Sequence, residues 1–363
     1  MISKGEKMPK LQIFKVQLSG VVAACIFMCV GSLFQPVAVS AQSNIVALLP
    51  LSGPQSEFGV AVQRGLSLAL EGSEVRVVFE DHRGKPTDAA SAFESLVSSN
   101  APAALVVFGS NTSLAVASKA QERGIPMIAI ATSDLIQKDK PNVFRHMLSP
   151  NTSARLLEEE VQRRGLSSVS AVTTTHDGMI AFKESFAARL KHPLVDDVLV
   201  DASETDLKPV AMSLLRKRPS GIFIGLMPPQ AALFARAIRG MGYKGELFAA
   251  TQIDMPSEFV SGGASFEGLW FARDGATRDP EFLERYRAKY QETPATFALN
   301  GYDVGLMIRE GITSENLVNH LTKLAHFKGA LGTYGANPDR AFSLPGSLWQ
   351  ISNGVPKQLS SSE

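Results

Sequence analysis

The chain has 363 residues, of which 45% are hydrophobic and 20% charged, so it is long enough for two domains that each bury a core. Its formal net charge of +1 gives no electrostatic basis for nucleic-acid binding, and no nucleic-acid partner is expected.

The N-terminus has the pattern of a processing segment. Four lysines, at positions 4, 7, 10 and 15, precede an apolar run over residues 18–34. Pro36 breaks this run, and Val39-Ser40-Ala41 offers the small residues that a signal peptidase needs. The pattern predicts a cleavable secretory signal over residues 1–41.

Two alternatives for this segment stay open. The apolar run is nearly long enough to span a bilayer, which would leave an uncleaved anchor. Val22-Ala23-Ala24-Cys25 also faintly resembles a lipoprotein box. Both cysteines of the chain, Cys25 and Cys29, lie here, so a mature chain would have no disulfide, thiolate nucleophile or cysteine metal site. It would keep 32 basic and 34 acidic residues, a formal charge of −2, which fits a soluble protein of a Gram-negative periplasm.

Strand-like and helix-like stretches alternate from residue 44 onward. The predicted strands are Asn44–Pro50, Val75–Glu80, Ala104–Phe108 and Pro126–Ala131. The predicted helices between and around them are Gly59–Leu70, Ala89–Ser99 and Ser113–Arg123. Alternation with short turns predicts a parallel sheet that is covered by helices.

The alternation stops at residues 147–152 and then begins again. The second set of predicted strands is Val169–Thr173, Leu194–Asp201, Gly221–Gly225, Glu246–Ala250, Leu269–Ala272 and Ser347–Ser352. The predicted helices are Ala154–Arg164, Ala181–Leu190, Leu207–Lys217, Gln230–Met241, Pro280–Gln291, Ala298–Gly311 and Glu315–Leu324. The repeated rhythm predicts two similar α/β lobes.

Small hydroxyl residues follow two strands that we expect to be neighbours. Ser110, Asn111 and Thr112 follow the strand Ala104–Phe108, and the next strand ends in Ala131-Thr132-Ser133. Ligands of such sheets bind outside the carboxyl ends of the strands, where hydroxyls and free backbone N–H groups form a neutral cradle for an anion. The alternative is that these side chains only cap helices.

Five ordered segments resemble one known family. They are LLPLSGPQSEFGVAVQRGLSLAL, VVFEDHRGKPTDAASAFESLV, GSNTSLAVASKAQERGIPMIAIATS, TPATFALNGYDVGLMIREGI and FKGALGTYGANPDRAFSLPGSLWQISNG. In this order they resemble the type I periplasmic solute-binding proteins of the branched-chain amino acid (Leu/Ile/Val) ABC-transporter group. The similarity covers nearly all of residues 44–358.

The resemblance implies two doubly wound parallel-sheet lobes that are joined by a three-strand hinge and close on a ligand. Lobe 1 would hold residues 44–148 and 273–335, and lobe 2 residues 149–272 and 345–358. Residues 336–344 would form the third crossover. The closed form of such a protein, expected as a monomer, docks on an ABC permease in the inner membrane.

The resemblance also implies ligand contacts in lobe 1. It assigns the ligand's α-carboxylate to Ser110, with Asn111 and Thr112 beside it. The residues that would bind the α-carboxylate and α-ammonium at the end of the fourth strand are Ala131, Thr132 and Ser133. Phe58 takes the place of an aromatic residue that packs on the ligand, with core packing as the alternative.

Lobe 2 departs from the family pattern at three loops. Residues 176–182 lack the usual tyrosine, and residues 226–229 lack a second aromatic residue. Thr251 and Gln252 stand where an acid usually pairs with the α-ammonium, which leaves Asp177 and Asp254 as possible replacements. Apolar residues form the rest of the expected wall, unless they pack the core of the lobe: Met179, Ile180 and Met227.

These departures predict a ligand with a carboxylate or amide head, an apolar body and no free α-amine, although a branched-chain amino acid stays open. We expect no catalytic site, metal or cofactor. His176-Asp177 is half of a triad at most, no Gly-x-Ser-x-Gly elbow occurs, and the six histidines show no metal-ligand spacing. The alternative function is a periplasmic receptor of the same fold that senses a ligand or activates another protein without transport.

Overall fold

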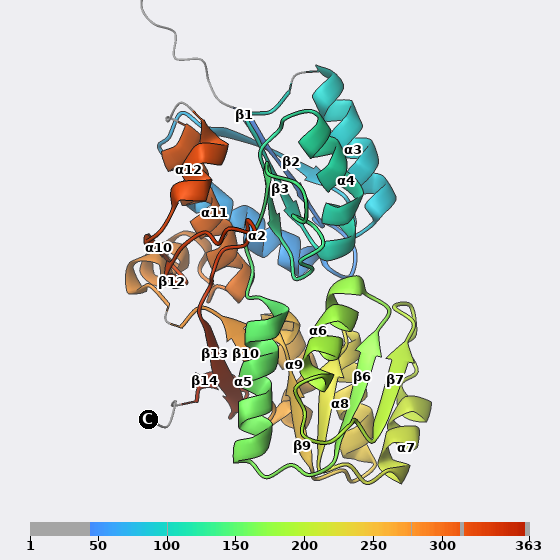
Figure 1. Ribbon diagram of the computed structural model, residues 1–363. Coiled ribbons are helices and arrows are strands. Elements are labelled where there is room, and N and C mark those ends of the chain that lie inside the picture. Colours follow the sequence, from blue (N-terminus) through green and yellow to red (C-terminus); the bar gives the residue numbers. More distant parts are fainter. Residues whose placement is uncertain (1–43, 100, 277, 313–315, 360–363) are drawn as a thin grey trace, which may run out of the picture. The chain divides into compact units, whose positions relative to one another are not determined.

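The structure, a computed structural model, describes residues 44–99, 101–276, 278–312 and 316–359. The predicted signal segment lies outside these ranges. The described chain forms two main β-sheets with helices packed on them, so the predicted α/β class with two parallel-sheet lobes is confirmed (Figure 1).

The first sheet has five parallel strands in the order β2-β1-β3-β4-β5. Their bounds are β1 Asn44–Leu49, β2 Arg76–Asp81, β3 Ala104–Phe108, β4 Met127–Ile130 and β5 Val143–Arg145. The sequence does not predict β5, because three residues are too few to show a periodic pattern. The strand order reverses between β1 and β3, so the loops after these two strands flank a crevice at the carboxyl edge of the sheet.

Helices cover both faces of this sheet, because alternate residues of a strand point to opposite faces. Ile45 and Leu49 of β1 pack with helices α2 (Ser56–Ala69), α10 (Pro280–Tyr290), α11 (Thr296–Ile312) and α12 (Leu317–Lys323). Val46 and Leu48 pack with α3 (Pro86–Ser99) and α4 (Ser110–Glu122), which lie side by side in Figure 1. The C-terminal helices therefore complete the core of the first sheet.

The contact between α2 and α11 depends on glycine. A Cβ atom on Gly65 would lie 2.0 Å from the carbonyl oxygen of Ala298, and one on Gly301 would lie 2.4 Å from that of Val62. Any side chain at either position would force the two helices apart. This packing holds the start of α11 next to the loop that follows β1.

The second sheet has seven strands in the order β14-β13-β10-β9-β8-β6-β7. Their bounds are β6 Val169–Thr174, β7 Asp196–Val200, β8 Gly221–Gly225, β9 Glu246–Ala249, β10 Trp270–Asp274, β13 Gly346–Ser352 and β14 Val355–Gln358. The five strands from β10 to β7 are parallel, and their order reverses between β6 and β8. The loops after β6 and β8 therefore flank the crevice of this sheet.

Helices also cover both faces of the second sheet. Phe223 of β8 packs with α5 (Pro150–Arg163) and α6 (Asp177–Ala187). Its neighbours Ile222 and Ile224 point to the other face, toward α7 (Lys208–Arg216) and α8 (Gln230–Gly240). Helix α9 (Pro256–Gly262) packs on α8, and two 3-10 turns, η1 (Thr251–Ile253) and η2 (Gly263–Phe266), flank it.

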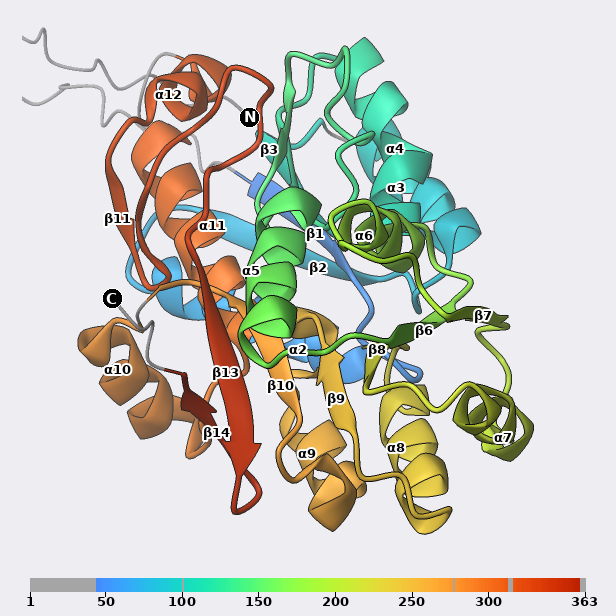
Figure 2. The same cartoon turned by 60° about the horizontal axis from the view of Figure 1, so that its bottom comes forward.

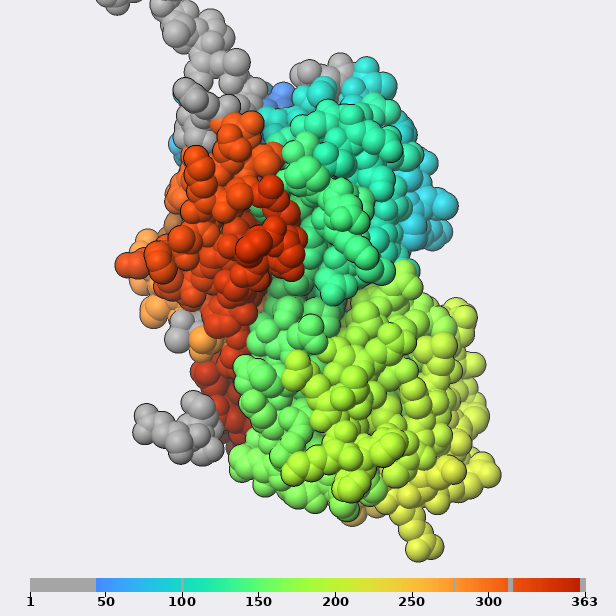
Figure 3. All heavy atoms as spheres, in the orientation of Figure 1, coloured from blue at the N-terminus to red at the C-terminus, as the bar shows by residue number. Residues whose placement is uncertain are grey.

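The last two strands differ from the parallel arrangement that the sequence predicts. β13 runs antiparallel to β10, and β14 runs antiparallel to β13. Asn353 and Gly354, with φ angles of 54° and 73°, join β13 to β14 in a two-residue hairpin turn, which Asn-Gly favours. In the space-filling view, β13 packs against α5 (Figure 3).

The chain passes three times between segments that pack with the first sheet and segments of the second. The passages lie between β5 and α5, between β10 and α10, and before β13 (Figure 2). The third passage follows a small hairpin of β11 (Phe327–Gly329) and β12 (Gly332–Tyr334). Strand β10 continues to Asp274, two residues past the boundary expected at 272.

Buried hydrogen bonds connect these passages. The backbone N–H of Leu148 donates to Asp274 Oδ2 at 3.0 Å. The hydroxyl of Tyr334 donates to Asp303 Oδ2 at 2.6 Å and accepts from Nε2 of His146 at 2.7 Å. Burial lowers the pKa of His146 to about 3, so its ring is neutral and supplies a single N–H.

Candidate functional site

A small cavity lies where the carboxyl ends of the strands of both sheets meet. The lining residues from the first sheet's loops are Gln55, Phe58, Phe108, Gly109, Ser110, Ile130, Ala131 and Thr132. Those from the second sheet's loops are His176, Met179, Met227 and Gln252, and Met147 and Phe297 complete the lining. Its volume is about 40 Å³, room for a few water molecules at most. Both strand-order reversals contribute loops to it, as the topology of such sheets predicts.

One wall of the cavity is aromatic. The ring centroids of Phe58 and Phe108 lie 5.7 Å apart in a stacked arrangement. Phe297, from the start of α11, meets both rings edge-on, at centroid distances of 5.0 and 5.2 Å. Three methionine side chains adjoin this wall, and their unbranched thioethers adapt to irregular apolar shapes. The wall therefore suits a flat or branched apolar group.

Two helix N-termini meet at the polar side of the cavity. Ser110 begins α4 and Asp177 begins α6, so each helix starts three or four residues earlier than the sequence analysis predicts. A Cβ atom on Gly178 would lie only 2.8 Å from Ser110 Oγ, which shows how closely the two first turns approach. Free N–H groups in a first turn, together with the helix dipole, favour an anion.

The hydroxyl of Ser110 lines this space and can donate a hydrogen bond into it. Its Oγ accepts a hydrogen bond of 3.2 Å from the backbone N–H of Ser133. Because the oxygen already accepts, the hydroxyl hydrogen is available for an acceptor such as a carboxylate oxygen. Ser133 itself does not line the cavity, and its own Oγ accepts from the N–H of Leu135 at 3.4 Å. Ser133 thus supports Ser110.

His176 lies at the start of α6 and adds a neutral polar group. Its Nδ1 atom is buried and has no hydrogen-bond partner among the described residues. Burial lowers the pKa of the ring, and the nearby charge of Asp177 offsets this only in part. A neutral imidazole can donate one hydrogen bond and accept another.

Gln252, in η1, has a buried acceptor atom without a hydrogen-bond donor among the described residues. Its Nε2 donates to the carbonyl oxygens of Ile224 at 2.9 Å and Leu226 at 3.4 Å. Its Oε1 is buried and finds no donor within the part of the chain that the structure describes. A buried acceptor without a donor is unfavourable, so this atom requires a partner.

The lining described above contains no Asp, Glu, Lys or Arg side chain. Asp254, one of the two acids considered as partners for an ammonium, is buried in an ion-pair network. Arg273 Nε donates to its Oδ2 at 2.6 Å, Arg278 Nη2 donates to the same atom at 3.3 Å, and Thr296 also donates to it. Asp177, the other candidate, is exposed and lies outside the lining. Neither acid replaces the missing partner in this structure.

The structure brings together seven of the twelve residues predicted to contact the ligand: Phe58, Ser110, Ala131, Thr132, Met179, Met227 and Gln252. The other five lie outside the cavity lining: Asn111, Thr112, Ser133, Ile180 and Thr251. Asn111 and Thr112 belong to the first turn of α4, and each helical residue points about 100° away from the one before it. The Thr112 hydroxyl donates back to the carbonyl oxygen of Phe108 at 2.5 Å. Ile180 turns away from Met179 for the same helical reason.

Sequence reasoning missed several lining residues. Phe297 comes from the start of α11, and only the packing of this helix brings it here. Met147 follows β5, the short strand that the sequence does not predict. His176 was visible in the loop after β6, but its position beside the N-terminus of α4 depends on the contact between α4 and α6. No local pattern distinguishes these residues from core residues.

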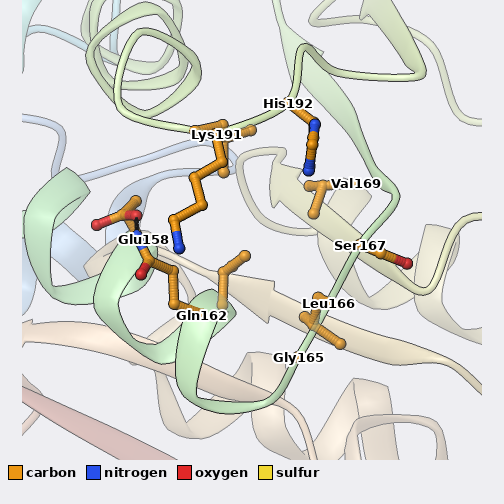
Figure 4. Close-up of a pocket in the computed structure, with 10 residues that line it drawn as sticks. Glu158, Gln162, Gly165, Leu166, Ser167, Val169, Lys191 and His192 are labelled. Carbon is orange, nitrogen blue, oxygen red and sulfur yellow. Dashed lines mark hydrogen bonds between the residues drawn. The ribbon is translucent and has the colours of Figure 1, made fainter.

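Larger hollows lie elsewhere on the surface. The one in Figure 4 has a volume of about 230 Å³ and is lined by residues of α5 such as Glu158, by the residues that lead into β6, and by Lys191 and His192 from the segment between α6 and β7. It lies at the amino edge of the second sheet, opposite to the edge where ligands of such sheets bind. Within the described ranges, no group of His, Cys, Asp and Glu is arranged to hold a metal ion.

Comparison with known proteins shows the family to which the chain belongs. A family model described as "Periplasmic binding protein" matches residues 42–354. The chain belongs to the periplasmic binding protein family. The type I, Leu/Ile/Val-related group predicted from the sequence is confirmed by this match together with the relatives described next.

Three relatives illustrate the range of this family. A Leu/Ile/Val-binding protein homologue of Brucella melitensis is 23% identical over 296 residues, which cover 76% of this chain and 80% of the relative. A leucine-binding protein of Thermotoga maritima has a TM-score of 0.83 at 24% identity, covering 88% of this chain and 98% of that one. A solute-binding protein of an ABC transporter from R. palustris, solved in complex with benzoate, has a TM-score of 0.77 at 20% identity, covering 87% and 95%.

Membership in the periplasmic binding protein family establishes a small-molecule ligand-binding function and a periplasmic or extracellular location. The relatives are substrate-binding proteins, and this chain is a binding protein and not an enzyme. Across the described residues, no helix combines the length and the apolar character needed to cross a membrane.

Proposed function

We propose that this periplasmic binding protein captures a small ligand with a carboxylate or amide head and an apolar body, and delivers it to an ABC permease of the inner membrane. The observation that carries the proposal is a cavity without acidic side chains, onto which the N-termini of α4 and α6 converge. This site matches an anionic head group and gives an α-ammonium no carboxylate partner.

The rest of the cavity supports an apolar body. Phe58, Phe108 and Phe297 form a continuous aromatic wall next to the methionines. An aromatic acid, a short fatty acid or an apolar amide has this division into a polar head and an apolar body. The R. palustris relative in complex with benzoate shows that the fold accepts such a ligand.

Ligand entry requires movement, because about 40 Å³ is too small for any of these molecules. In the proposed cycle, two lobes with the boundaries predicted from the sequence open and close at the three passages. The protein acts as a monomer after removal of residues 1–41 in the periplasm.

Matched ligand pairs test the proposal. Isothermal titration of residues 42–363 compares leucine with 4-methylpentanoate, and phenylalanine with 3-phenylpropionate and its amide. We expect the members without an α-amine to bind at least tenfold more tightly in at least one series. Tight binding of leucine or phenylalanine, with none of the des-amino members, would overturn the proposal. Uptake of the labelled ligand by cells with and without the gene then tests delivery to a permease.

A further inference from the structure

We propose that Gln252 accepts a hydrogen bond from a neutral donor on the ligand. The preferred ligand is then an apolar carboxylic acid or amide that also carries a hydroxyl or an additional amide N–H. This inference rests on the proposed function and specifies the chemistry of the same cavity. It begins with the bare Oε1 atom of Gln252.

The orientation of the Gln252 amide is fixed by its partners. Its Nε2 lies within hydrogen-bond distance of two carbonyl oxygens, those of Ile224 and Leu226, which can only accept. The terminal atom facing them must therefore be nitrogen, and the other must be the oxygen. Oε1 can accept hydrogen bonds and cannot donate one.

Gln252 is also held in place by burial. The residue is 2% exposed and lines the cavity together with Met227 and Met179, whose side chains offer no strong donor. Because the amide nitrogen is tied to β8 and to the residue that follows it, Oε1 cannot swing away toward solvent without breaking these hydrogen bonds. A donor on the bound ligand would satisfy it.

A neutral donor fits this acceptor better than an ammonium does. Transfer of a charged ammonium into a cavity without a carboxylate costs more free energy than transfer of a hydroxyl or amide, because a single amide oxygen does not replace the lost hydration of the charge. Such an acceptor also discriminates strongly between ligands with and without a hydroxyl. A site built to bond a ligand hydroxyl rejects an analogue without it, because the buried acceptor is then left unpaired.

Gln230 provides a matched control. It is 3% exposed, its Nε2 donates to the carbonyl oxygens of Asp201 and Glu204 at 2.8 Å each, and its Oε1 also has no partner among the described residues. Unlike Gln252, it does not line the cavity. Replacement of either glutamine by methionine removes the same groups from the protein, but only one replacement changes the cavity.

The test is isothermal titration with pairs that differ only by a neutral donor: benzoate with 3- and 4-hydroxybenzoate, and 3-phenylpropionate with 3-phenyllactate. We expect the wild-type protein to bind the hydroxylated member of at least one pair at least tenfold more tightly. This ratio should fall below threefold in Gln252→Met and stay unchanged in Gln230→Met.

Two results would overturn the inference: ratios below threefold for every pair in the wild type, or a ratio that Gln252→Met leaves unchanged. If Gln252→Met does not fold, Gln252→Glu serves instead, and it should shift preference from 3-phenyllactate toward phenylalanine; no shift contradicts the inference. Binding of both members of every pair with equal affinity would leave the proposed function intact and reject only the role of Gln252. Binding of no carboxylate or amide at all would reject both.

Discussion

Ser110, which lines the cavity, and Gly178, which lies outside the lining, are so close that a Cβ atom on Gly178 would come within 2.8 Å of Ser110 Oγ and 3.3 Å of the His176 ring. Ser110 begins α4 on the first sheet and Gly178 lies in the first turn of α6 on the second. The absence of a side chain at Gly178 is what lets the two helix N-termini approach. The same two first turns form the proposed cradle for the ligand's head group.

Gly178→Ala should weaken ligand binding. The added methyl group would force Ser110 or the first turn of α6 to move, and overpacking of this kind costs about 1–3 kcal/mol. We expect the dissociation constant to rise by about that free energy in isothermal titration. Gly240→Ala is the control, because a Cβ atom there would meet nothing within 4 Å. Equal affinities of Gly178→Ala and the wild type would show that the two turns do not approach in the bound state.

Ser110→Ala should cost about 1–3 kcal/mol of binding free energy if the hydroxyl donates to a charged head group. Titration with the tightest ligand from the matched pairs measures this loss. Ser113→Ala is a control on the same helix, since Ser113 is buried, lies outside the cavity lining and has no bond from its Oγ to any described residue. Unchanged affinity in Ser110→Ala would leave Ser110 with only its role as acceptor for the Ser133 N–H.

Asp274 should make the stability of the protein depend on pH. Burial raises its pKa to about 6, although hydrogen bonds from the Leu148 N–H and from Asn300, together with the charge of Arg145, act in the opposite direction. The pKa in the unfolded chain is about 3.9. Since the folded-state value is the higher one, the stabilising contribution is complete below about pH 4 and is lost as the pH rises through about 6.

Asp274→Asn removes this titration and should keep the local contacts. The amide oxygen can accept from the Leu148 N–H and from Asn300, and the amide nitrogen would take the place of Oδ1, which no described residue contacts by a hydrogen bond. Between pH 4.5 and 7.5, the free energy of unfolding of the wild type should fall relative to that of the variant by about 2 kcal/mol. Urea denaturation at both pH values measures it; a parallel pH dependence in the two proteins would refute the buried titration.

Asp254→Ala should destabilise the fold without changing ligand preference. Burial alone would raise the pKa of Asp254, but the guanidinium groups of Arg273 and Arg278 hold it below its usual value, so the carboxylate is charged. Its removal leaves two largely buried cations without their partner and should cost about 3–5 kcal/mol of unfolding free energy.

Chemical denaturation measures this cost, with Glu71→Ala as the control. Glu71 pairs with Lys289 at 2.9 Å on the surface, where an ion pair contributes about 0–1 kcal/mol. The ratio of affinities for des-amino and amino ligands should stay as in the wild type. If the folded Asp254→Ala protein had a different ratio of these affinities, Asp254 would contribute to ligand binding, contrary to this prediction.

The sequence by itself determined the α/β class and the parallel strands of both sheets, and it predicted the location of the candidate site at the strand ends. These features follow from local patterns, since buried parallel strands are continuous apolar runs and the carboxyl edge is fixed by chain direction. Ser110 and Gln252 could be predicted as ligand contacts because each lies within a few residues of the end of a strand.

Tertiary structure decided which of these residues meet. Phe297 reaches the cavity only because glycines let α11 pack closely on α2, and Asp254 is unavailable to a ligand only because Arg273 and Arg278 reach it from β10 and from the residues that follow it. The first turn of α4 turns Ser110 toward the cavity and Thr112 toward the carbonyl of Phe108. Local periodicity specifies the face of an element that is buried; contacts between residues distant in sequence specify what it is buried against, and no short stretch of sequence contains that information.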